Sequence, residues 1–503
     1  MPRKKVGKSV EEAAGQELLS LDQAAAALKV SRSTLTRWLS EGRVKGFKVG
    51  RQWRFKQADL NKFSQMAHPS AAAVNVSEVE AVLEQLSAPG EREFEFVDPV
   101  LAGYPTTEEE KALDRLFVAL AYRASEANAS DIHVDGERDA SVVRLRIDGV
   151  LQEVARLPIS VHRALVACVK LHSGLAVDQT QVNQDGRTRI RVKGDERDLR
   201  VTTMPSILGE TVVMRLLARD YEVPDFDRMG MMPEDQERYL RALRAPCGLL
   251  IVSGPTGSGK TTVIYSGLER IVAPHIKAYS IEDPVEFSLR GITQIPVVRK
   301  TGMTFEHILQ SLMRADPDVI MVGGMDSQVV GEKCLQAAIT GHLVLSTLHA
   351  QTTAAAITRM LEIGLEPFML AETLVAVMAV RLARRVCQHC AEPDEPAFSA
   401  LSLFAERARA GGYTLPSKPR FLRGQGCEQC SGYGYRGRTG LFEVMEMDPE
   451  LCQMVLERAP AKAIQEAAVK KGMTTLVADG MRKAAEGITT VVEAMRVTQG
   501  ADV

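Results

Sequence analysis

One segment of the chain has the residue types and spacing of a loop that binds a nucleoside triphosphate. The run Gly254-Pro-Thr-Gly-Ser-Gly-Lys260-Thr261 fits the pattern G-x-x-x-x-G-K-[ST]. Glycines allow backbone N–H groups to curl around phosphate oxygens at the positive end of a helix. An apolar run at residues 248–252 predicts a buried strand before the loop, and residues 262–271 predict a helix after it.

The loop pattern assigns roles to individual side chains. Lys260 would reach the β- and γ-phosphates, and the Thr261 hydroxyl would ligate Mg²⁺. The residues expected to contact ATP are Gly254, Pro255, Thr256, Gly257, Ser258, Gly259, Lys260, Thr261 and Thr262.

Three carboxylates follow a probable strand in the run Ser280-Ile-Glu-Asp-Pro-Val-Glu286-Phe. Carboxylates beside a phosphate loop repel one another unless a cation is present. We therefore expect Glu282 and Asp283 to hold Mg²⁺ through water. The alternative interpretation is a solvated strand end that binds no metal.

Four of the eight cysteines form two C-x-x-C pairs, Cys387 with Cys390 and Cys427 with Cys430, separated by 36 residues. Two such pairs supply four thiolates, which suit tetrahedral Zn²⁺. A closed set of four cysteines indicates a structural metal rather than a catalytic one. A redox dithiol is the competing interpretation, but redox motifs seldom come in matched pairs.

A sheet must position these residues. The sequence predicts further strands within residues 314–323 and 340–349. Strands that alternate with helices around a phosphate loop predict a parallel sheet with ligands at the carboxyl ends of its strands.

Together these blocks resemble the secretion ATPase family that powers type II secretion and type IV pilus assembly. In chain order they match its phosphate loop, its Asp box, its Walker B region and its His box. Blocks within residues 130–215 resemble the family's small α/β domain, and the resemblance extends from about Val100 to the C-terminus. It implies an α/β multidomain fold, in which a RecA-like P-loop ATPase core follows the small α/β domain and carries a tetracysteine zinc knuckle.

The resemblance also implies further site residues. Glu286 stands where the Asp box of the family carries its catalytic glutamate, which polarises the attacking water. Arg200 and Arg215 would reach the phosphates as a homo-hexamer closes; without the resemblance they are sheet-surface arginines. His349, like His342, either senses the γ-phosphate or satisfies the core. The family's partner is an inner-membrane platform protein.

The Walker B block departs from the family pattern. The family has Gly-Glu-(Ile or Met)-Arg-Asp, whereas this chain has Gly323-Gly-Met-Asp-Ser327. Gly324 thus replaces the glutamate that would organise Mg²⁺ and water. Since loss of a carboxylate slows phosphoryl transfer without abolishing ATP binding, we predict tight binding with weak hydrolysis. Asp326 and Glu286 are the two residues that could compensate.

Residues 18–64 are typical of a small basic domain. Ser20 and Gln23 predict a capping box, and Ser31 predicts the start of a second helix. The run FKVGRQWRF at residues 47–55 predicts a hairpin. Its apolar side chains are expected to point inward: Phe47, Val49, Trp53 and Phe55.

Two short helices before a basic hairpin resemble a winged helix-turn-helix of the excisionase and MerR type. A DNA-binding role would place the second helix in a major groove and the hairpin on the phosphates. The residues expected to contact DNA are Arg32, Ser33, Thr36, Arg37, Lys48, Arg51 and Arg54. The alternative is a protein-docking domain with a solvated basic face.

The composition supports a basic module joined to an acidic body. The 503 residues carry a formal charge of −2, but residues 1–64 hold 14 Lys and Arg against 6 Asp and Glu. No apolar run reaches the roughly 18 residues of a membrane span, and no signal peptide is present, so we expect a cytoplasmic protein, peripheral to the inner membrane through its partners. The expected domains are a winged helix-turn-helix at 1–66, a linker at 67–102, the small α/β domain at 103–222, the ATPase core at 223–386, the knuckle at 387–437 and a helical region at 438–503.

Two functions agree with these features. The first is an ATP-driven motor that assembles a pilus or a secretion pseudopilus. The second is a nucleotide-gated regulator or adaptor, which binds DNA or a protein through its N-terminal module and hydrolyses little ATP. The retained phosphate loop, Asp box and cysteine pairs favour the motor.

Overall fold

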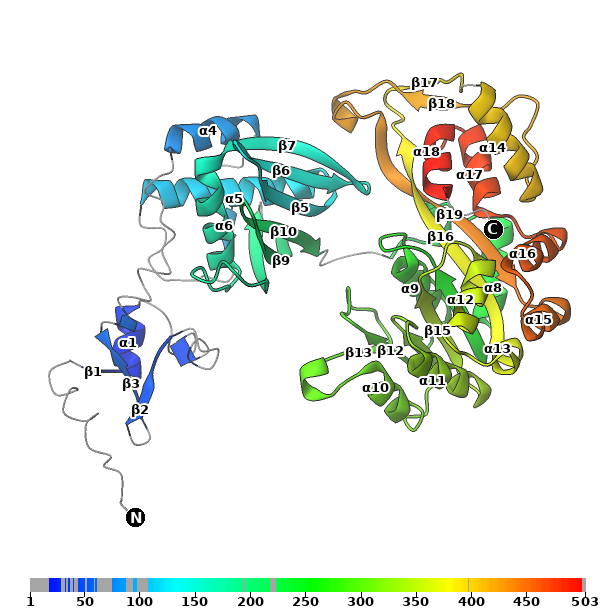
Figure 1. Cartoon of the computed structure of the whole chain (residues 1–503), viewed down its shortest axis with the longest axis horizontal. Helices are drawn as coiled ribbons and strands as arrows, with labels where there is room; N and C mark the ends of the chain where they lie inside the picture. The colour runs from blue at the N-terminus through cyan, green and yellow to red at the C-terminus, as the bar shows by residue number, and fades with distance from the viewer. Residues whose placement is uncertain are drawn as a thin grey trace, which may run out of the picture. The chain divides into compact units, whose positions relative to one another are not determined.

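The computed structural model describes residues 18–28, 32, 35–36, 39, 44–49, 52–57, 59–60, 75–86, 94–96, 107–192, 195–217, 223–396 and 398–499. The chain forms two compact units, Met1–Asp220 and Tyr221–Val503 (Figure 1). Within the described residues, no helix is both long enough and apolar enough to cross a membrane.

The N-terminal basic module contains a three-stranded antiparallel sheet in the order β1-β3-β2. Its elements are β1 (Leu18–Ser20), α1 (Leu21–Ala27), β2 (Phe47–Val49) and β3 (Gln52–Lys56). The capping box is confirmed, because Ser20 Oγ accepts from the Gln23 N–H at 3.2 Å and Gln23 Oε1 accepts from the Ser20 N–H at 2.8 Å. The strand β1, which the sequence did not predict, pairs with β3.

The hairpin is present, but its register differs from the prediction. Phe47 pairs with Arg54, and Val49 pairs with Gln52. An odd-numbered residue of β2 therefore faces the same side as an even-numbered residue of β3. Phe47 and Val49 thus lie on the face opposite Trp53 and Phe55. Phe55 is fully buried, whereas Phe47 and Val49 are 37% and 53% exposed. The prediction that all four side chains point inward is wrong.

Part of the predicted DNA-binding face can be placed. Arg32 and Thr36 are helical and exposed, and Arg32 lies 3.5 Å from Asp22. Lys48 is exposed on β2, with its ammonium 5.1 Å from the centre of the Trp53 ring. Arg54 on β3 donates to Gln52. Several predicted residues lie outside the described part of the chain: Ser31, Ser33, Arg37 and Arg51.

The small α/β domain is a seven-stranded antiparallel sheet in the order β4-β8-β9-β10-β5-β6-β7. Alternate strand residues and three helices form one apolar core, and the opposite sheet face carries charged side chains. The helices are α4 (Val76–Gln85), α5 (Glu108–Glu126) and α6 (Ile159–His172). The strands are β4 (Phe94–Phe96), β5 (Ala129–Gly136), β6 (Ala140–Ile147), β7 (Val150–Pro158), β8 (Gln184–Val192), β9 (Asp195–Ser206) and β10 (Gly209–Leu217).

Two segments of the predicted linker at 67–102 belong to this domain. Helix α4 buries Val79 and Leu83 in the core, and its Glu80 lies 2.7 Å from Arg115 of α5. The strand β4 pairs with β8, and Phe96 stacks on His172 at 3.6 Å. These segments are therefore packed structure, not free chain.

The second unit is built on a seven-stranded sheet in the order β13-β12-β14-β15-β11-β16-β19 (Figure 1). The first six strands are parallel and β19 is antiparallel to β16. The strands are β11 (Gly248–Ser253), β12 (Ala278–Glu282), β13 (Ile292–Pro296), β14 (Val319–Val322), β15 (Leu343–Leu348), β16 (Leu374–Val386) and β19 (Tyr435–Glu446).

Helices cover both faces of this sheet, since Leu250 and Val252 of β11 join one apolar cluster while Leu249 and Ile251 join the other. The first cluster includes α7 (Phe226–Met229), α8 (Pro233–Leu243) and α9 (Lys260–Ile271). The second includes α10 (Phe305–Leu312), α11 (Gln328–Ile339), α12 (Thr353–Glu362), α13 (Pro367–Thr373), α15 (Pro449–Leu456) and α16 (Ala461–Lys470).

The cysteine-bearing segment is an insertion between the paired strands β16 and β19. It contains β17 (Ala391–Pro393), α14 (Phe398–Ala410) and β18 (Leu422–Gly424). The region predicted as helical at 438–503 begins within β19 and becomes helical at α15, followed by α16, α17 (Leu476–Ala485) and α18 (Val491–Thr498). The residues before the cysteines form α13 and then the 13-residue strand β16.

Candidate nucleotide and metal sites

The glycine-rich loop leaves the carboxyl end of β11 in a conformation that requires glycine. Gly254 has a φ of +154°, and a Cβ there would lie 2.7 Å from the Val380 carbonyl oxygen. Gly257 has a φ of +75° and open space where a Cβ would be. Helix α9 begins at Lys260 without a side-chain cap. Its first N–H groups are therefore available to an anion.

The donors of this loop fit a triphosphate. Lys260 Nζ donates to the carbonyls of Gly254 and Pro255 at 2.8 and 3.0 Å, so the ammonium lies over the loop. Ser258 Oγ is buried and has no hydrogen-bond partner among the described residues. Thr261 is half-buried in the first turn of α9, where its hydroxyl suits a divalent cation. These groups supply the donors and the oxygen ligand that a metal–nucleotide complex needs.

Three influences set the charge state of Lys260. Burial lowers its pKa to about 8, the nearby Asp326 carboxylate raises the pKa, and Arg381 lowers it. Arg381 is 5% exposed, and donates to the Val380 carbonyl at 3.0 Å and to the Gln351 carbonyl at 2.7 Å. Sequence reasoning missed this arginine as a site residue. Its signal was a charged residue within the apolar strand β16.

The Asp box lies after β12, at the same sheet edge as the phosphate loop because both strands are parallel. Glu286 is exposed in the loop that follows β12. The Asp283 carboxylate is 3.1 Å from Arg299.

Hydrogen bonds from three side chains already occupy the Glu282 carboxylate. Glu282 is 2% exposed, and its carboxylate accepts hydrogen bonds from Tyr265, Ser280 and Gln294. Since Tyr265 lies on α9, Glu282 ties this helix to the sheet. The expectation that Glu282 holds Mg²⁺ through water therefore disagrees with the structure.

The two histidines of the His box lie at opposite edges of the sheet. The His342 carbonyl accepts from the Gly248 N–H at the start of β11, and His349 follows Leu348, whose carbonyl accepts from the Gly254 N–H. A six-residue strand separates the two edges by about 20 Å. His349 is exposed beside the phosphate loop, whereas the His342 ring contacts the Ala337 carbonyl at 2.8 Å. Phosphate sensing by His342 is excluded within one subunit.

The two predicted arginines of the small domain share one charged row. Arg200 on β9 pairs with Arg187 on β8 and with Arg215 on β10, and Arg215 pairs with Asp131 on β5. Directly paired residues face the same side of a sheet. Arg215 is 60% exposed although its Nε lies 2.9 Å from Asp131. The row is thus a cationic stripe on the sheet face opposite the apolar core.

The four paired cysteines converge with the geometry of a zinc site. Their Sγ atoms are 3.9 Å apart for Cys387 and Cys427, and 3.8 Å for both Cys390–Cys430 and Cys427–Cys430. A tetrahedron with Zn–S bonds of about 2.3 Å has edges of about 3.8 Å. All four thiols are free.

Close backbone packing holds this knuckle together. The Gly426 N–H donates to Cys390 Sγ at 3.3 Å, and the Gly434 N–H donates to Cys430 Sγ at 3.2 Å. A Cβ on Gly424 would lie 2.0 Å from the Gly434 carbonyl, so the two loop strands approach only because both residues are glycine.

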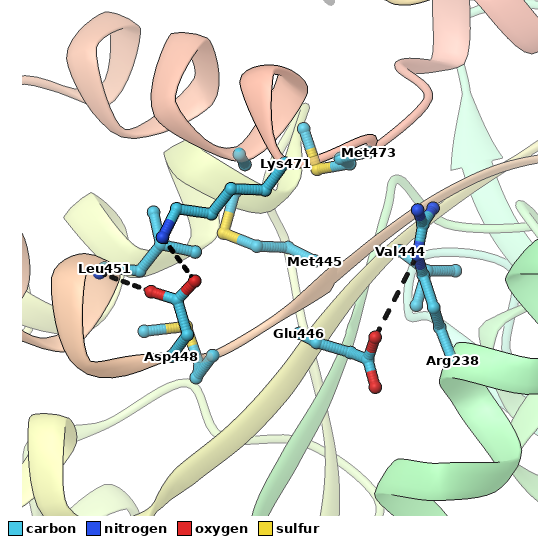
Figure 2. Close-up of a pocket in the computed structure, with 10 residues that line it drawn as sticks. Arg238, Val444, Met445, Glu446, Asp448, Leu451, Lys471 and Met473 are labelled. Atoms are coloured by element: carbon cyan, nitrogen blue, oxygen red, sulfur yellow. Dashed lines mark hydrogen bonds and ion pairs between the residues drawn. The ribbon is translucent and has the colours of Figure 1, made fainter.

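A separate pocket of about 320 Å³ lies between α8, β19, α15 and α16 (Figure 2). Lys471 contacts Asp448 on one side of it, and Arg238 contacts Glu446 on the other. It contains none of the residues predicted to bind nucleotide or metal. Because its charged side chains already pair with one another, this pocket adds nothing to the nucleotide site.

Comparison with known sequences identifies the family. A profile described as "Type II/IV secretion system protein" matches residues 106–496, and one described as "Helix-turn-helix domain" matches residues 18–66. "Type II secretion system protein E" of Pseudomonas aeruginosa is 38% identical over 392 residues, which cover 78% of this chain and 76% of that protein. "Type IV pilus assembly ATPase PilB" of Thermus thermophilus is 38% identical over 397 residues, covering 78% of this chain but 44% of that protein.

Solved structures support the fold. The ATPase DotB of Legionella pneumophila has a TM-score of 0.55 at 18% identity, covering 76% of this chain and 95% of that chain. The pilus retraction motor PilT with bound ADP has a TM-score of 0.50 at 22% identity, covering 75% of this chain and 95% of that chain. The expected α/β multidomain ATPase fold is thus confirmed. The chain belongs to the type II/IV secretion system protein family, as an ATPase that carries a helix-turn-helix domain.

Proposed function

We propose that this chain is the motor subunit of a type II secretion or type IV pilus assembly system. The observation that carries the proposal is the phosphate loop at the sheet edge, with Lys260, Thr261 and Asp283 in the same unit. In this proposal the chain forms a homo-hexamer in the cytoplasm and works with a platform protein of the inner membrane. The names of the relatives support this assignment, since they are a secretion protein E and a pilus assembly ATPase.

Each part of the site has a role in the proposed hydrolysis. Lys260 and the loop N–H groups hold the phosphates, Thr261 and Asp283 hold Mg²⁺, and Glu286 orients the attacking water. Mg²⁺ bound there would neutralise part of the negative charge on the phosphates. The water oxygen bonds to the γ-phosphorus while the bond between the γ-phosphorus and the β,γ-bridging oxygen breaks. The products are ADP, phosphate and a proton. We further propose that zinc in the four-cysteine knuckle is structural and that hydrolysis is slower than in relatives with an intact Walker B block.

The ring proposal predicts that ATP hydrolysis per subunit rises with protein concentration as hexamers form. Arg215→Ala should remove most of this rise, because the proposed ring brings this exposed arginine to nucleotide held by another subunit. The measurement is turnover per subunit alongside mass determination by light scattering. Arg138→Ala, at another exposed arginine of the same domain, is the control. A rate independent of both concentration and Arg215 would contradict the ring motor.

A second candidate function is DNA binding through the N-terminal module. The helix-turn-helix match and the exposed Arg32, Thr36 and Lys48 favour it over a protein-docking role. In this proposal Ser33, Arg37 and Arg51 complete the contact surface, whereas Arg54 lies on the hairpin face opposite Lys48 and does not share it.

This second proposal predicts that the full chain binds duplex DNA with an affinity that falls as salt rises. Replacing Lys48 with alanine should weaken binding to all sequences and lower the salt slope by about one. Fluorescence anisotropy with labelled duplexes measures both quantities, and Lys462→Ala, on the exposed face of α16, is the control. Binding that ignores salt and Lys48 would leave the protein-docking role.

A further inference from the structure

We propose that Asp326 supplies the carboxylate that the Walker B block has lost at position 324, and that it faces the metal–phosphate complex. This inference rests on the proposed function, because it assigns a residue to the same hydrolytic site. The Asp326 side chain would act with Thr261 in holding Mg²⁺ and its water.

Position supports this role. A Cβ built on Gly324 would lie 3.2 Å from Asp326 Oδ2 and 3.9 Å from its carboxyl carbon. In a glutamate the carboxyl carbon lies about 2.5 Å from Cβ, across two C–C bonds of about 1.5 Å. The Asp326 carboxylate therefore lies within the reach of a glutamate side chain at 324.

The backbone around Asp326 is fixed at the edge of the sheet. The Gly323 N–H donates to the Ile281 carbonyl at 2.8 Å, and the Met325 N–H donates to the Thr347 carbonyl at 3.0 Å. The Met325 side chain is fully buried, and Ser327 caps α11. Asp326 thus lies between two anchored residues, which fix the position of its backbone.

The Asp326 carboxylate is accessible and acts on the phosphate loop. Asp326 is exposed, and within the described part of the chain no side chain pairs with its carboxylate. Its negative charge raises the pKa of Lys260. Glu282 cannot serve in its place, because hydrogen bonds from α9 and β13 occupy its buried carboxylate.

The three departures from the family block then have separate explanations. Gly324 leaves room for the Asp326 carboxylate, and Asp326 replaces an arginine that could not ligate a cation. Ser327 is an N-cap, a position where serine and aspartate serve equally well. Two of the changes thus form a pair, and the third is neutral for helix α11.

The direct test is Asp326→Asn in the full chain, which removes the charge and keeps the shape. We expect Mg²⁺ to strengthen ATP binding in the wild type and to do so at least tenfold less in the variant. Equilibrium binding of a fluorescent ATP analogue with and without Mg²⁺ measures this effect, and hydrolysis should fall by about 10² to 10³. Asp326→Glu should retain part of both. Glu332→Gln, an exposed acid on α11, should change neither.

A second variant tests the same assignment from position 324. Gly324→Glu should fail to raise hydrolysis, because the Asp326 carboxylate lies next to the new side chain and repels its charge. An Asp326→Asn protein with wild-type Mg²⁺ dependence and turnover overturns the inference, as does a sharp gain from Gly324→Glu. A wild-type chain that binds ATP with Mg²⁺ through Asp326 but never hydrolyses it supports the inference while refuting the proposed motor.

Discussion

Replacing Lys260 with alanine is expected to lower ATP hydrolysis by the full chain by about 10² to 10³. The ammonium lies over the phosphate loop, where it would stabilise the charge that develops on the β- and γ-phosphates. Steady-state phosphate release with Mg²⁺ is the measurement. Lys462→Ala is the control, since this lysine is exposed on α16. A Lys260→Ala protein with more than about a tenth of the wild-type rate would contradict this role.

The same substitution should also remove a pH dependence. Burial lowers the pKa of Lys260 to about 8, against the opposing effect of Asp326, and a bound triphosphate raises the pKa again. Binding above pH 8 therefore takes up a proton, so wild-type affinity for ATP should fall as pH rises, by up to tenfold per pH unit. Binding measured between pH 7 and 9.5 should be much flatter in Lys260→Ala.

Replacing Cys427 with serine is expected to remove zinc and to unfold the knuckle between β16 and β19. Four thiols at tetrahedral spacing indicate that the metal holds the two cysteine turns together, whereas α14 of the same insertion packs on α17 and α18 through Phe404 and Ala408. Structural zinc in small domains contributes about 10–16 kcal/mol of apparent binding free energy, so its loss is not offset locally. Elemental analysis should find one zinc per wild-type chain, and limited proteolysis should cut the variant within 387–434.

The control for this prediction is Cys247→Ser, because Cys247 is exposed and lies outside the knuckle. It should keep its zinc and its resistance to proteolysis. If Cys427→Ser kept full zinc, or if the wild type took up none after reduction and addition of zinc, the redox interpretation of the two pairs would gain support.

Features that depend on a few neighbouring residues were predictable from the sequence. The phosphate loop depends on glycines within one turn, and the capping box depends on Ser20 and Gln23 three positions apart. The cysteine pairs were also predictable, because each pair forms its own short turn and only their meeting requires the fold. Local geometry fixes such features, so tertiary packing changes them little.

Features that depend on pairing between distant segments were not predictable. The pairing register between β2 and β3 decides on which face Phe47 lies, and the hydrophobic pattern alone does not reveal that register. Glu282 was assigned to a metal because it adjoins Asp283, but strand alternation and the approach of Tyr265 bury it. Arg381 approaches the phosphate loop because its strand β16 pairs with β11, and these two strands are far apart in the chain.

The ends of the knuckle have a consequence for the descent of this family. Val386 and Tyr435 are directly paired neighbours on β16 and β19, so the intervening segment leaves the sheet and returns to the same place. A two-residue hairpin could bridge these strands with the sheet order unchanged. Ancestral gain or loss of the whole metal-bearing outgrowth therefore needs only one event at a strand junction. Such an event would leave the order of the strands in the ATPase sheet unchanged.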